Sequence, residues 1–258
     1  MKFNTIWIAS VPRTGSMWTT NVIREIHKIS EFNVFPKNMI QLEKDWFNFY
    51  NDNAPFDKNE LNRYVIKIHS KLTVIPPRSK IVVNIRNPYE ICASYKDFMK
   101  CNLEKSINVA VNLSNWIKYY KNLEKNILYI KYEHIENNAK DVIANLAKFC
   151  EIELTSNQNE YINSKYSKKN IQEIIKKNDD EIKYQKNENL LNNQKKIVKF
   201  QDGSYRSFDL NTGFQSGHIS QRKTGEWNKM FTIEEKKIII DKLDPIAIEL
   251  GYNSEKTN

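Results

Sequence analysis

The chain has 258 residues, a length that suits one large α/β domain. Apolar residues make up 40% of the chain and aromatic residues 12%, enough for a sizeable core and too much for a disordered protein. The formal charge of +9 indicates anionic partners, but Lys is frequent throughout the chain, so charge alone only keeps nucleic-acid binding open as one alternative.

Three further features predict a cytoplasmic protein without a membrane partner. No apolar run reaches 18 residues, so the sequence offers no candidate transmembrane helix. The first apolar region contains Arg13, which disfavours a signal peptide. Cys92, Cys101 and Cys150 are odd in number and lack the spacing of metal ligands, as expected in a reducing compartment.

The most informative segment covers residues 6–18 and reads IWIASVPRTGSMW. An apolar run typical of a buried strand meets a tight turn, and helical spacing follows over 22–29. Such a turn aims unpaired backbone N–H groups at one point, where phosphate is the usual ligand. Gly15 allows a close approach of the backbone, and Arg13 adds a fixed cation. Further hydrogen-bond donors are the hydroxyls of Ser16, Thr19 and Thr20.

Strands and helices then alternate along the chain. The predicted elements are loops over 31–63 with a short helix near 40–50, strands over 64–69, 80–85 and 127–131, and helices over 89–100, 105–125 and 138–150. This alternation predicts an α/β fold with a central parallel sheet of about five strands and helices on both faces.

The last hundred residues are more polar. Residues 155–200 are crowded with Lys, Asn, Gln and Glu, which predicts mobile or weakly packed helices. Residues 197–208 alternate in polarity on both sides of an Asp-Gly pair, the signature of a β-hairpin. A final amphipathic helix is predicted over 233–250, with Ile238, Ile239, Leu243, Ile246 and Leu250 on its buried side. We expect one domain over 1–258 with a variable polar segment and hairpin at 155–220.

A second candidate site lies at the end of a predicted strand, where residues 83–95 read VNIRNPYEICASY. Arg86 ends the strand, Pro88 opens a helix and Ser94 follows about two turns later. An arginine at a strand end can hold a phosphate through two parallel hydrogen bonds. The alternative from these residues alone is a surface arginine beside a helix-start proline.

Lys67 and His69 end the predicted strand over 64–69. Ligands of open parallel sheets gather at the carboxyl ends of the strands, the edge that would also carry Arg13 and Arg86. A histidine there can accept a proton from a hydroxyl near neutral pH, although a lone histidine at a strand end is more often structural. We interpret the other histidines as structural: His27, His134 and His218.

Five segments, in order, resemble the sulfotransferases that use 3′-phosphoadenylyl sulfate (PAPS). Residues 12–18 resemble their phosphosulfate loop, P-[KR]-[ST]-G-[ST]-x-[WL], and residues 86–95 resemble their signature for the 3′-phosphate. The other three are KIH at 67–69, YIKYEHI at 129–135 and QRKTGEWNKMFT at 221–232. In this chain Arg13 replaces a common lysine, Met17 replaces a hydroxyl residue, and a glycine is missing before Thr224.

The resemblance implies transfer of a sulfuryl group from PAPS to a hydroxyl, or less often an amine, of a small-molecule acceptor. The product is adenosine 3′,5′-bisphosphate (PAP), and no metal is needed. The implied catalytic residues are His69 as general base, with Arg13 and Lys67 as cations beside the transferring group. The implied donor-binding residues are Arg13, Thr14, Gly15, Ser16, Met17, Trp18, Arg86, Ser94, Tyr132, Arg222 and Lys223. For Trp18 and Tyr132, implied near the adenine, ordinary core packing is the alternative.

Two other functions stay open at this point. One is a small-molecule or nucleotide kinase using ATP and magnesium, although the loop G-x-x-x-x-G-K-[ST] is absent. The other is a basic nucleic-acid-binding protein without turnover. The sequence identifies neither the acceptor nor the oligomeric state.

Overall fold

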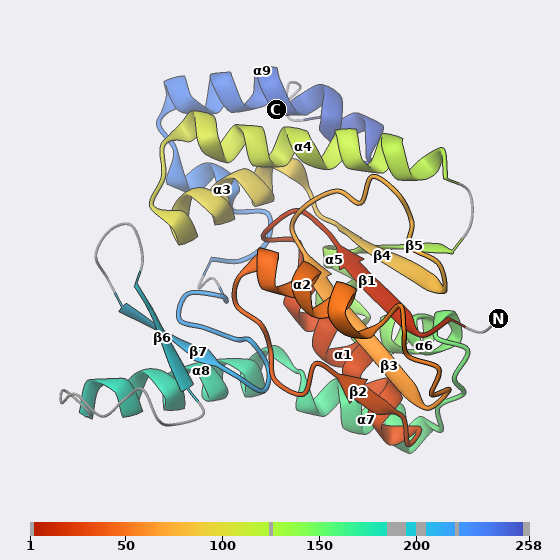
Figure 1. The fold of residues 1–258 in the computed structure, drawn as a ribbon. Helices are drawn as coiled ribbons and strands as arrows, with labels where there is room; N and C mark the ends of the chain where they lie inside the picture. The colour runs from red at the N-terminus through yellow and green to blue at the C-terminus, as the bar shows by residue number, and fades with distance from the viewer. Residues whose placement is uncertain (1–2, 124–125, 185–194, 200–204, 220–221, 255–258) are drawn as a thin grey trace.

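The computed structural model describes residues 3–123, 126–184, 195–199, 205–219 and 222–254. A five-stranded sheet lies at the centre, with every neighbouring pair parallel (Figure 1). The strands, in spatial order, are β2 (Asn33–Phe35), β3 (Asn62–Ile68), β1 (Thr5–Ala9), β4 (Ser79–Ile85) and β5 (Ile127–Lys131). The prediction of a parallel sheet of about five strands is confirmed.

The register of the sheet brings three functional segments to one edge. β1 pairs with β3 up to Ala9↔Ile68 and with β4 up to Ile8↔Val82, so the carboxyl ends of all three strands lie together. Every residue of β1 and β4 is buried, because helices cover both faces of the sheet. The segments that follow these strands therefore meet at the same edge.

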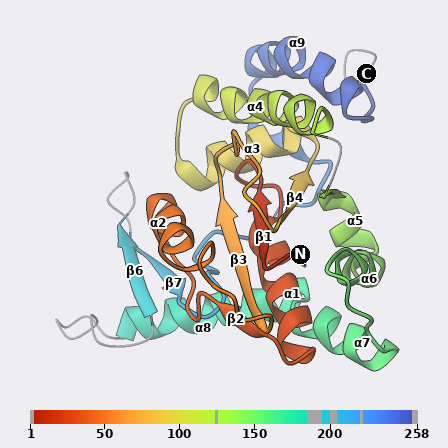
Figure 2. The same ribbon diagram turned by 45° about the vertical axis from the view of Figure 1, so that its right-hand side comes forward.

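Helices form a layer on each side of the sheet. They are α1 (Ser16–Ile29), α2 (Glu43–Asn53), α3 (Pro88–Met99), α4 (Leu103–Lys121), α5 (Tyr132–Asn137), α6 (Ala139–Phe149), α7 (Ser156–Lys165), α8 (Lys168–Tyr184) and α9 (Ile233–Glu249), with a short 3₁₀ helix, η2 (Trp227–Met230). Figure 2 shows α3, α4 and α9 stacked beyond the carboxyl ends of the strands. The three helices share one hydrophobic cluster, which fixes α3 at this end of the sheet.

Helices α7 and α8 are better packed than the sequence predicts. Ile162 is fully buried, and Tyr166 and Ile171 are almost so; all three belong to the main core cluster. Apolar side chains four residues apart, such as Ile171 and Ile175, suffice to anchor a helix whose other positions are polar. The expectation of weak packing is therefore wrong for these two helices.

Two smaller expectations are also wrong. Residues 33–35 form β2, an edge strand that pairs with β3 inside a segment expected to be loops; three residues are too few for a period-two signal. In α9, Ile239 and Leu243 are fully buried, but Ile238 is 49% exposed. Burial on α9 follows the stripe that faces α4, which excludes Ile238.

The predicted hairpin is confirmed, and it packs against α8 (Figure 1). It consists of β6 (Lys195–Lys199) and β7 (Tyr205–Asp209), with Lys195 opposite Asp209. The predicted Asp-Gly turn lies outside the described residues. After β7 the chain returns across α1, where the Thr212 carbonyl accepts a hydrogen bond from Asn21 Nδ2 at 2.7 Å. No helix in the described ranges has the length and apolar character needed to cross a bilayer.

Candidate active site

The turn between β1 and α1 has the geometry of an anion-binding loop. Gly15 has a φ of +89°, and α1 begins at the next residue. A Cβ at Gly15 would lie 2.9 Å from Tyr132 Cδ2, so both the conformation and the space require glycine. The first N–H groups of α1 have no acceptor within the helix, and its first turn holds no acidic residue. The loop can therefore hold an anion such as phosphate.

Several hydroxyls near this loop are used inside the protein. Thr20 Oγ1 donates to the Ser16 carbonyl at 2.7 Å, and Thr19 Oγ1 accepts from Asn84 Nδ2 at 2.7 Å. Both threonines are fully buried, so the expectation that they donate to a ligand is wrong. The buried Thr14 hydroxyl donates to a loop carbonyl at 2.8 Å, which leaves the loop backbone and Ser16 as its ligand donors.

Arg13 is held by contacts from two directions. Its Nε donates to Ser94 Oγ at 2.9 Å, and its Nη2 donates to the carbonyls of Gly217 and His218 at 3.3 and 3.1 Å. The guanidinium carbon lies 4.3 Å from the centre of the Phe98 ring. Burial lowers the pKa of Arg13, but a guanidinium keeps its charge at neutral pH. Arg13 therefore supplies a fixed positive charge between α3 and the segment after β7.

Arg86 lies on the other side of the loop. Its Nη1 donates to the Arg13 carbonyl at 2.9 Å, and its guanidinium carbon lies 4.0 Å from the centre of the Tyr132 ring. Its Nε is buried and has no hydrogen-bond partner among the described residues. A buried N–H normally has an acceptor, so the Arg86 side chain suits a bound oxyanion.

Glu90 joins Arg86 to the segment that follows residue 221. Its Oε2 lies 3.6 Å from Arg86 Nη2 and 3.2 Å from Arg222 Nη2. Its Oε1 accepts from the Gly225 N–H at 2.9 Å. The structure thus brings Arg13, Arg86 and Arg222 together. Sequence reasoning gave Glu90 no role; its only signal was the acidic position within the segment 86–95.

The segment 222–226 has a second attachment. The Thr224 hydroxyl donates to Glu136 on α5, so the segment is fixed to both α3 and α5. Lys223 is exposed, and its backbone N–H donates to Glu226 Oε2 at 3.4 Å. The segment around Thr224 is therefore attached to both helices although it lacks the family's first glycine.

Lys67 and His69 lie together at the carboxyl end of β3. His69 Nδ1 is 2.7 Å from the Ser10 carbonyl, and since a carbonyl only accepts, Nδ1 carries the proton. Nε2 is then an acceptor and receives a hydrogen bond from Lys67 Nζ at 2.8 Å. The backbone N–H of His69 donates to Glu43 Oε1 at 3.0 Å, which connects α2 to this edge of the sheet. The imidazole is neutral, with its lone pair on the side of Lys67.

The charges of this pair follow from their surroundings. Burial, and then the nearby Lys67 ammonium, lowers the pKa of His69 to about 3. Burial lowers the pKa of Lys67 to about 8, while Glu43 acts in the opposite direction. At neutral pH the histidine is a free base beside a mostly protonated lysine.

His218 also comes to this site, although the sequence gave no reason to expect it. Its ring centre lies 5.5 Å from that of Phe98, and its Nδ1 accepts from the Gln215 N–H at 3.3 Å. Burial, and then Arg13, holds the pKa of His218 well below its usual range. Only the return of the chain after β7 brings this residue to Arg13.

The remaining predicted residues are Trp18, Met17 and Tyr132. Trp18 is 8% exposed, and its indole N–H donates to the Tyr166 carbonyl at 3.0 Å. Met17 packs against the returning segment, since a Cβ at Gly213 would lie 2.7 Å from Met17 Cε. Tyr132 lies between Gly15 and the Arg86 guanidinium, at the phosphate loop.

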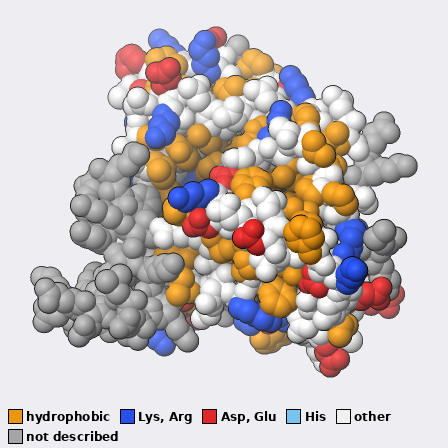
Figure 3. Space-filling view, viewed as in Figure 1, with side chains coloured by type: hydrophobic (Ala, Val, Ile, Leu, Met, Phe, Trp, Pro, Cys, Tyr) orange, Lys and Arg blue, Asp and Glu red, His pale blue; other side chains and the backbone are white. Residues whose placement is uncertain are grey.

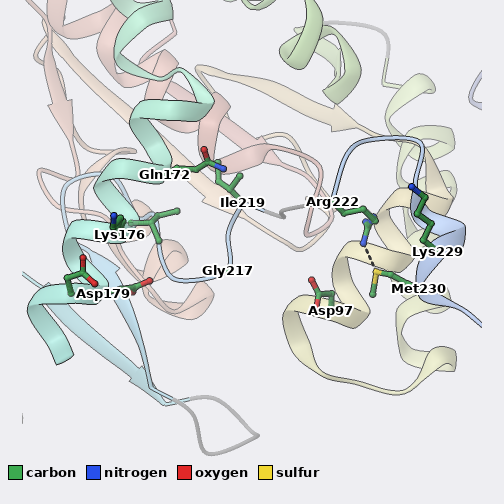
Figure 4. A pocket seen from close by; sticks show the side chains of 11 residues that line it. Asp97, Gln172, Lys176, Asp179, Gly217, Ile219, Arg222, Lys229 and Met230 are labelled. Atoms are coloured by element: carbon green, nitrogen blue, oxygen red, sulfur yellow. Dashed lines mark hydrogen bonds between the residues drawn. The ribbon is translucent and has the colours of Figure 1, made fainter.

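A cleft of about 990 Å³ is lined in part by Gly217, Ile219 and Arg222. Figure 4 shows Arg222 and Met230 on one side of it and α8, with Gln172 and Lys176, on the other. Of the predicted site residues in the described ranges, Arg222 alone lines this cleft. The same ranges contain no group of three or more His, Cys, Asp or Glu side chains arranged to hold a metal ion.

The sulfotransferase domain family matches residues 3–234, which is most of the chain. The chain therefore belongs to the sulfotransferase family, and the predicted enzyme class is confirmed. No curated protein sequence matches it.

Solved structures show the same fold. Retinol dehydratase in a complex with retinol and PAP has 14% identity and a TM-score of 0.61, over 96% of this chain and 82% of that chain. Retinol dehydratase in complex with androsterone and inactive cofactor PAP has 15% identity and a TM-score of 0.58, over 96% and 81%. Mouse sulfotransferase SULT7A1 complexed with PAP has 16% identity and a TM-score of 0.58, over 94% and 84%.

These comparisons give no support to the kinase or nucleic-acid alternatives. On the face drawn in Figure 3, the Lys and Arg side chains of the described residues are scattered among Asp and Glu and form no single basic patch. A nucleic-acid surface would gather them on one stripe.

Proposed function

We propose that this sulfotransferase moves a sulfuryl group from PAPS to a hydroxyl, or less often an amine, of a small-molecule acceptor. The observation that carries the proposal is the meeting of Arg13, Arg86 and Arg222 around the β1–α1 loop, with His69 at the same sheet edge. A one-domain organisation over 1–258 and a cytoplasmic location belong to the same proposal. The location is supported by three cysteines without disulfides: Cys92, Cys101 and Cys150.

The residues present fit a donor with phosphate at both ends. The loop N–H groups and Arg13 would hold the 5′ end, where Gly15 keeps the backbone open. The 3′-phosphate would lie near Arg86, whose buried Nε has no acceptor among the described residues. The other donor-binding groups that we propose are Ser94, Tyr132, Arg222 and Lys223, with Thr14, Ser16, Met17 and Trp18 around the loop.

When bound, PAPS supplies a sulfuryl group already activated by a phosphate leaving group. His69 takes the proton of the acceptor hydroxyl on Nε2, while the bond from Nδ1 to the Ser10 carbonyl holds the ring in place. Nε2 has one lone pair, so Lys67 must give up its hydrogen bond to that atom when the hydroxyl takes its place. The freed ammonium and Arg13 then neutralise charge that develops during transfer.

Burial first, and then the charges of Lys67 and Arg13, lower the pKa of His69 to about 3. An anion bound near Lys67 and Arg13 favours the protonated imidazole and raises this pKa toward neutrality. His69 is therefore a base whose strength depends on donor binding. Burial and the two cations keep the imidazole of His69 unprotonated before the donor binds.

A thermal-shift comparison tests the proposal. PAP without magnesium should raise the melting temperature of the wild type more than ATP with magnesium does. It should not stabilise Arg86→Met, which lacks the cation at the loop. Lys118→Met is the matched control, because Lys118 is an exposed cation on α4 paired with Glu249.

Turnover with labelled PAPS and a panel of alcohols, phenols and amines completes the test. A larger shift with ATP and magnesium would instead favour the kinase. Tight, salt-sensitive binding of oligonucleotides with no response to PAP would favour the nucleic-acid-binding protein.

A further inference from the structure

Strand β7 turns two side chains toward the active-site edge. Side chains alternate along a strand, and Ser207 faces α8, where its hydroxyl donates to Asp179 Oδ1 at 2.6 Å. Arg206 and Phe208 therefore lie on the opposite face. Phe208 is buried in the cluster that contains Leu72, just beyond the carboxyl end of β3. Arg206 thus faces the space between β7 and the edge that carries His69.

The Phe98 ring fixes the position of Arg206. The Arg206 guanidinium carbon lies 4.7 Å from the ring centre, and that of Arg13 lies 4.3 Å from the same centre. The His218 ring centre is 5.5 Å away. A Cβ at Gly217 would lie 3.6 Å from Arg206 Nη1, so the segment that contacts Arg13 also contacts Arg206. Two guanidinium groups therefore share one aromatic side chain at the site.

Three cations direct positive charge at His218, whose ring lies beside Phe98. After burial, the charges of Arg13, Lys67 and Arg206 all lower the pKa of His218, so three elements direct positive charge at one place. Among the carboxylates of this region, Asp97 pairs with Lys100 Nζ, Asp179 accepts from the hydroxyls of Ser207 and Ser216, and Glu43 accepts from the backbone N–H of His69. Such a field attracts anions.

We propose that the acceptor carries an anionic group, a carboxylate or a phosphate, and that Arg206 binds it while the acceptor hydroxyl faces His69. The inference rests on the proposed function, in which Arg13 and Lys67 serve the transferring group. A guanidinium matches a carboxylate or phosphate through two parallel hydrogen bonds. The Phe98 ring offers an apolar face for the carbon skeleton between the two groups.

Matched acceptors test this inference directly. We would measure kcat/KM with PAPS for acceptors that share a 4-hydroxyphenyl group, such as 3-(4-hydroxyphenyl)propionate, its amide, tyramine and 4-hydroxybenzyl phosphate, together with an aliphatic series. The wild type should prefer the anionic members by about tenfold to a hundredfold, the range for hydrogen bonds to charged groups. Arg206→Gln should lose this preference and keep its activity with the amides. Lys118→Gln should behave like the wild type.

Two further measurements separate the possible failures. If PAP does not stabilise the wild type, the proposed function is overturned. If PAP stabilises it but neutral and anionic acceptors react equally well, or no anionic acceptor reacts, only the inference on Arg206 is overturned. The wild-type preference should also shrink as salt rises, which tests the idea even if Arg206→Gln does not fold. A preference that persists unchanged in Arg206→Gln assigns the anion to another group and overturns the inference.

Discussion

The proposed donor side and the proposed acceptor side of the site are held in place in different ways. On the donor side, the phosphate loop follows β1 and Arg86 directly follows β4, so the sheet register positions both. On the acceptor side, Arg206 and His218 belong to the hairpin and the segment after it, which is attached by side-chain contacts. A residue at a strand end is positioned by the backbone, whereas a residue on a docked segment depends on every contact that docks it.

Arg13 is where the two sides meet. Its Nε binds Ser94 on the donor side, and its Nη2 binds the carbonyls of Gly217 and His218 on the acceptor side. Variants that separate donor binding, acceptor binding and transfer can therefore test whether the two sides work independently.

The largest effect is expected at His69, between the two sides. His69→Asn should lower kcat by about 10²–10⁴, the usual contribution of a general base, with the PAP-induced thermal shift unchanged. His134→Asn, on an exposed position of α5, is the control. Near-normal turnover of His69→Asn would show that another group accepts the proton.

The next effect should be confined to the donor side. Glu90 is 1% exposed and joins Arg86 to Arg222, so Glu90→Gln leaves two arginines facing each other. Breaking a buried ion pair from one side costs about 3–5 kcal/mol. We expect a loss of this order in urea unfolding, together with weaker PAP binding.

Glu136 is exposed and bonds to Thr224 and Tyr132, so Glu136→Gln should lose far less stability. Equal stability of the two variants would mean that Glu90 does not hold the arginines together.

A smaller effect should appear on the acceptor side. Asp179 Oδ1 accepts from the hydroxyls of Ser207 and Ser216, which fixes the hairpin to α8. Asp179→Asn replaces charged hydrogen bonds, each worth about 1.5–3 kcal/mol, with weaker neutral ones. The acceptor KM should rise while the donor KM stays constant, and amide exchange in β7 should quicken. Glu173→Gln, exposed on the same helix, serves as control. A rise in donor KM as well would disprove the separation of the two sides.

The smallest effect is a shift in pH dependence at Lys67. Burial sets the pKa of Lys67 to about 8, so its positive charge is lost as the pH rises through that value. The kcat/KM for the donor should therefore fall above about pH 8. In Lys67→Arg the charge persists, and the alkaline limb should move to higher pH even if overall activity is lower. An identical limb in both proteins would assign it to another group.

The sequence placed the residues of the proposed donor side on the right elements, because each lies within a few positions of a strong strand or helix signal. The turn before α1, Arg86 at the end of β4 and Ser94 in α3 could all be placed from periodicity and from Gly and Pro positions. The direction in which an individual side chain points could not be predicted from these signals. The Thr19 and Thr20 hydroxyls face inward, because their positions on α1 point into the core.

By itself, then, the sequence determined the alternation of strands and helices, the turn between β1 and α1, and the hairpin, since these depend on local periodicity and turn chemistry. Only the tertiary structure decided which side chains complete the site. Glu90 became a link between two arginines, and His218 and Arg206 reached Phe98, through the docking of segments more than a hundred residues apart. Such contacts depend on how whole elements pack against each other, and no local sequence pattern predicts that packing.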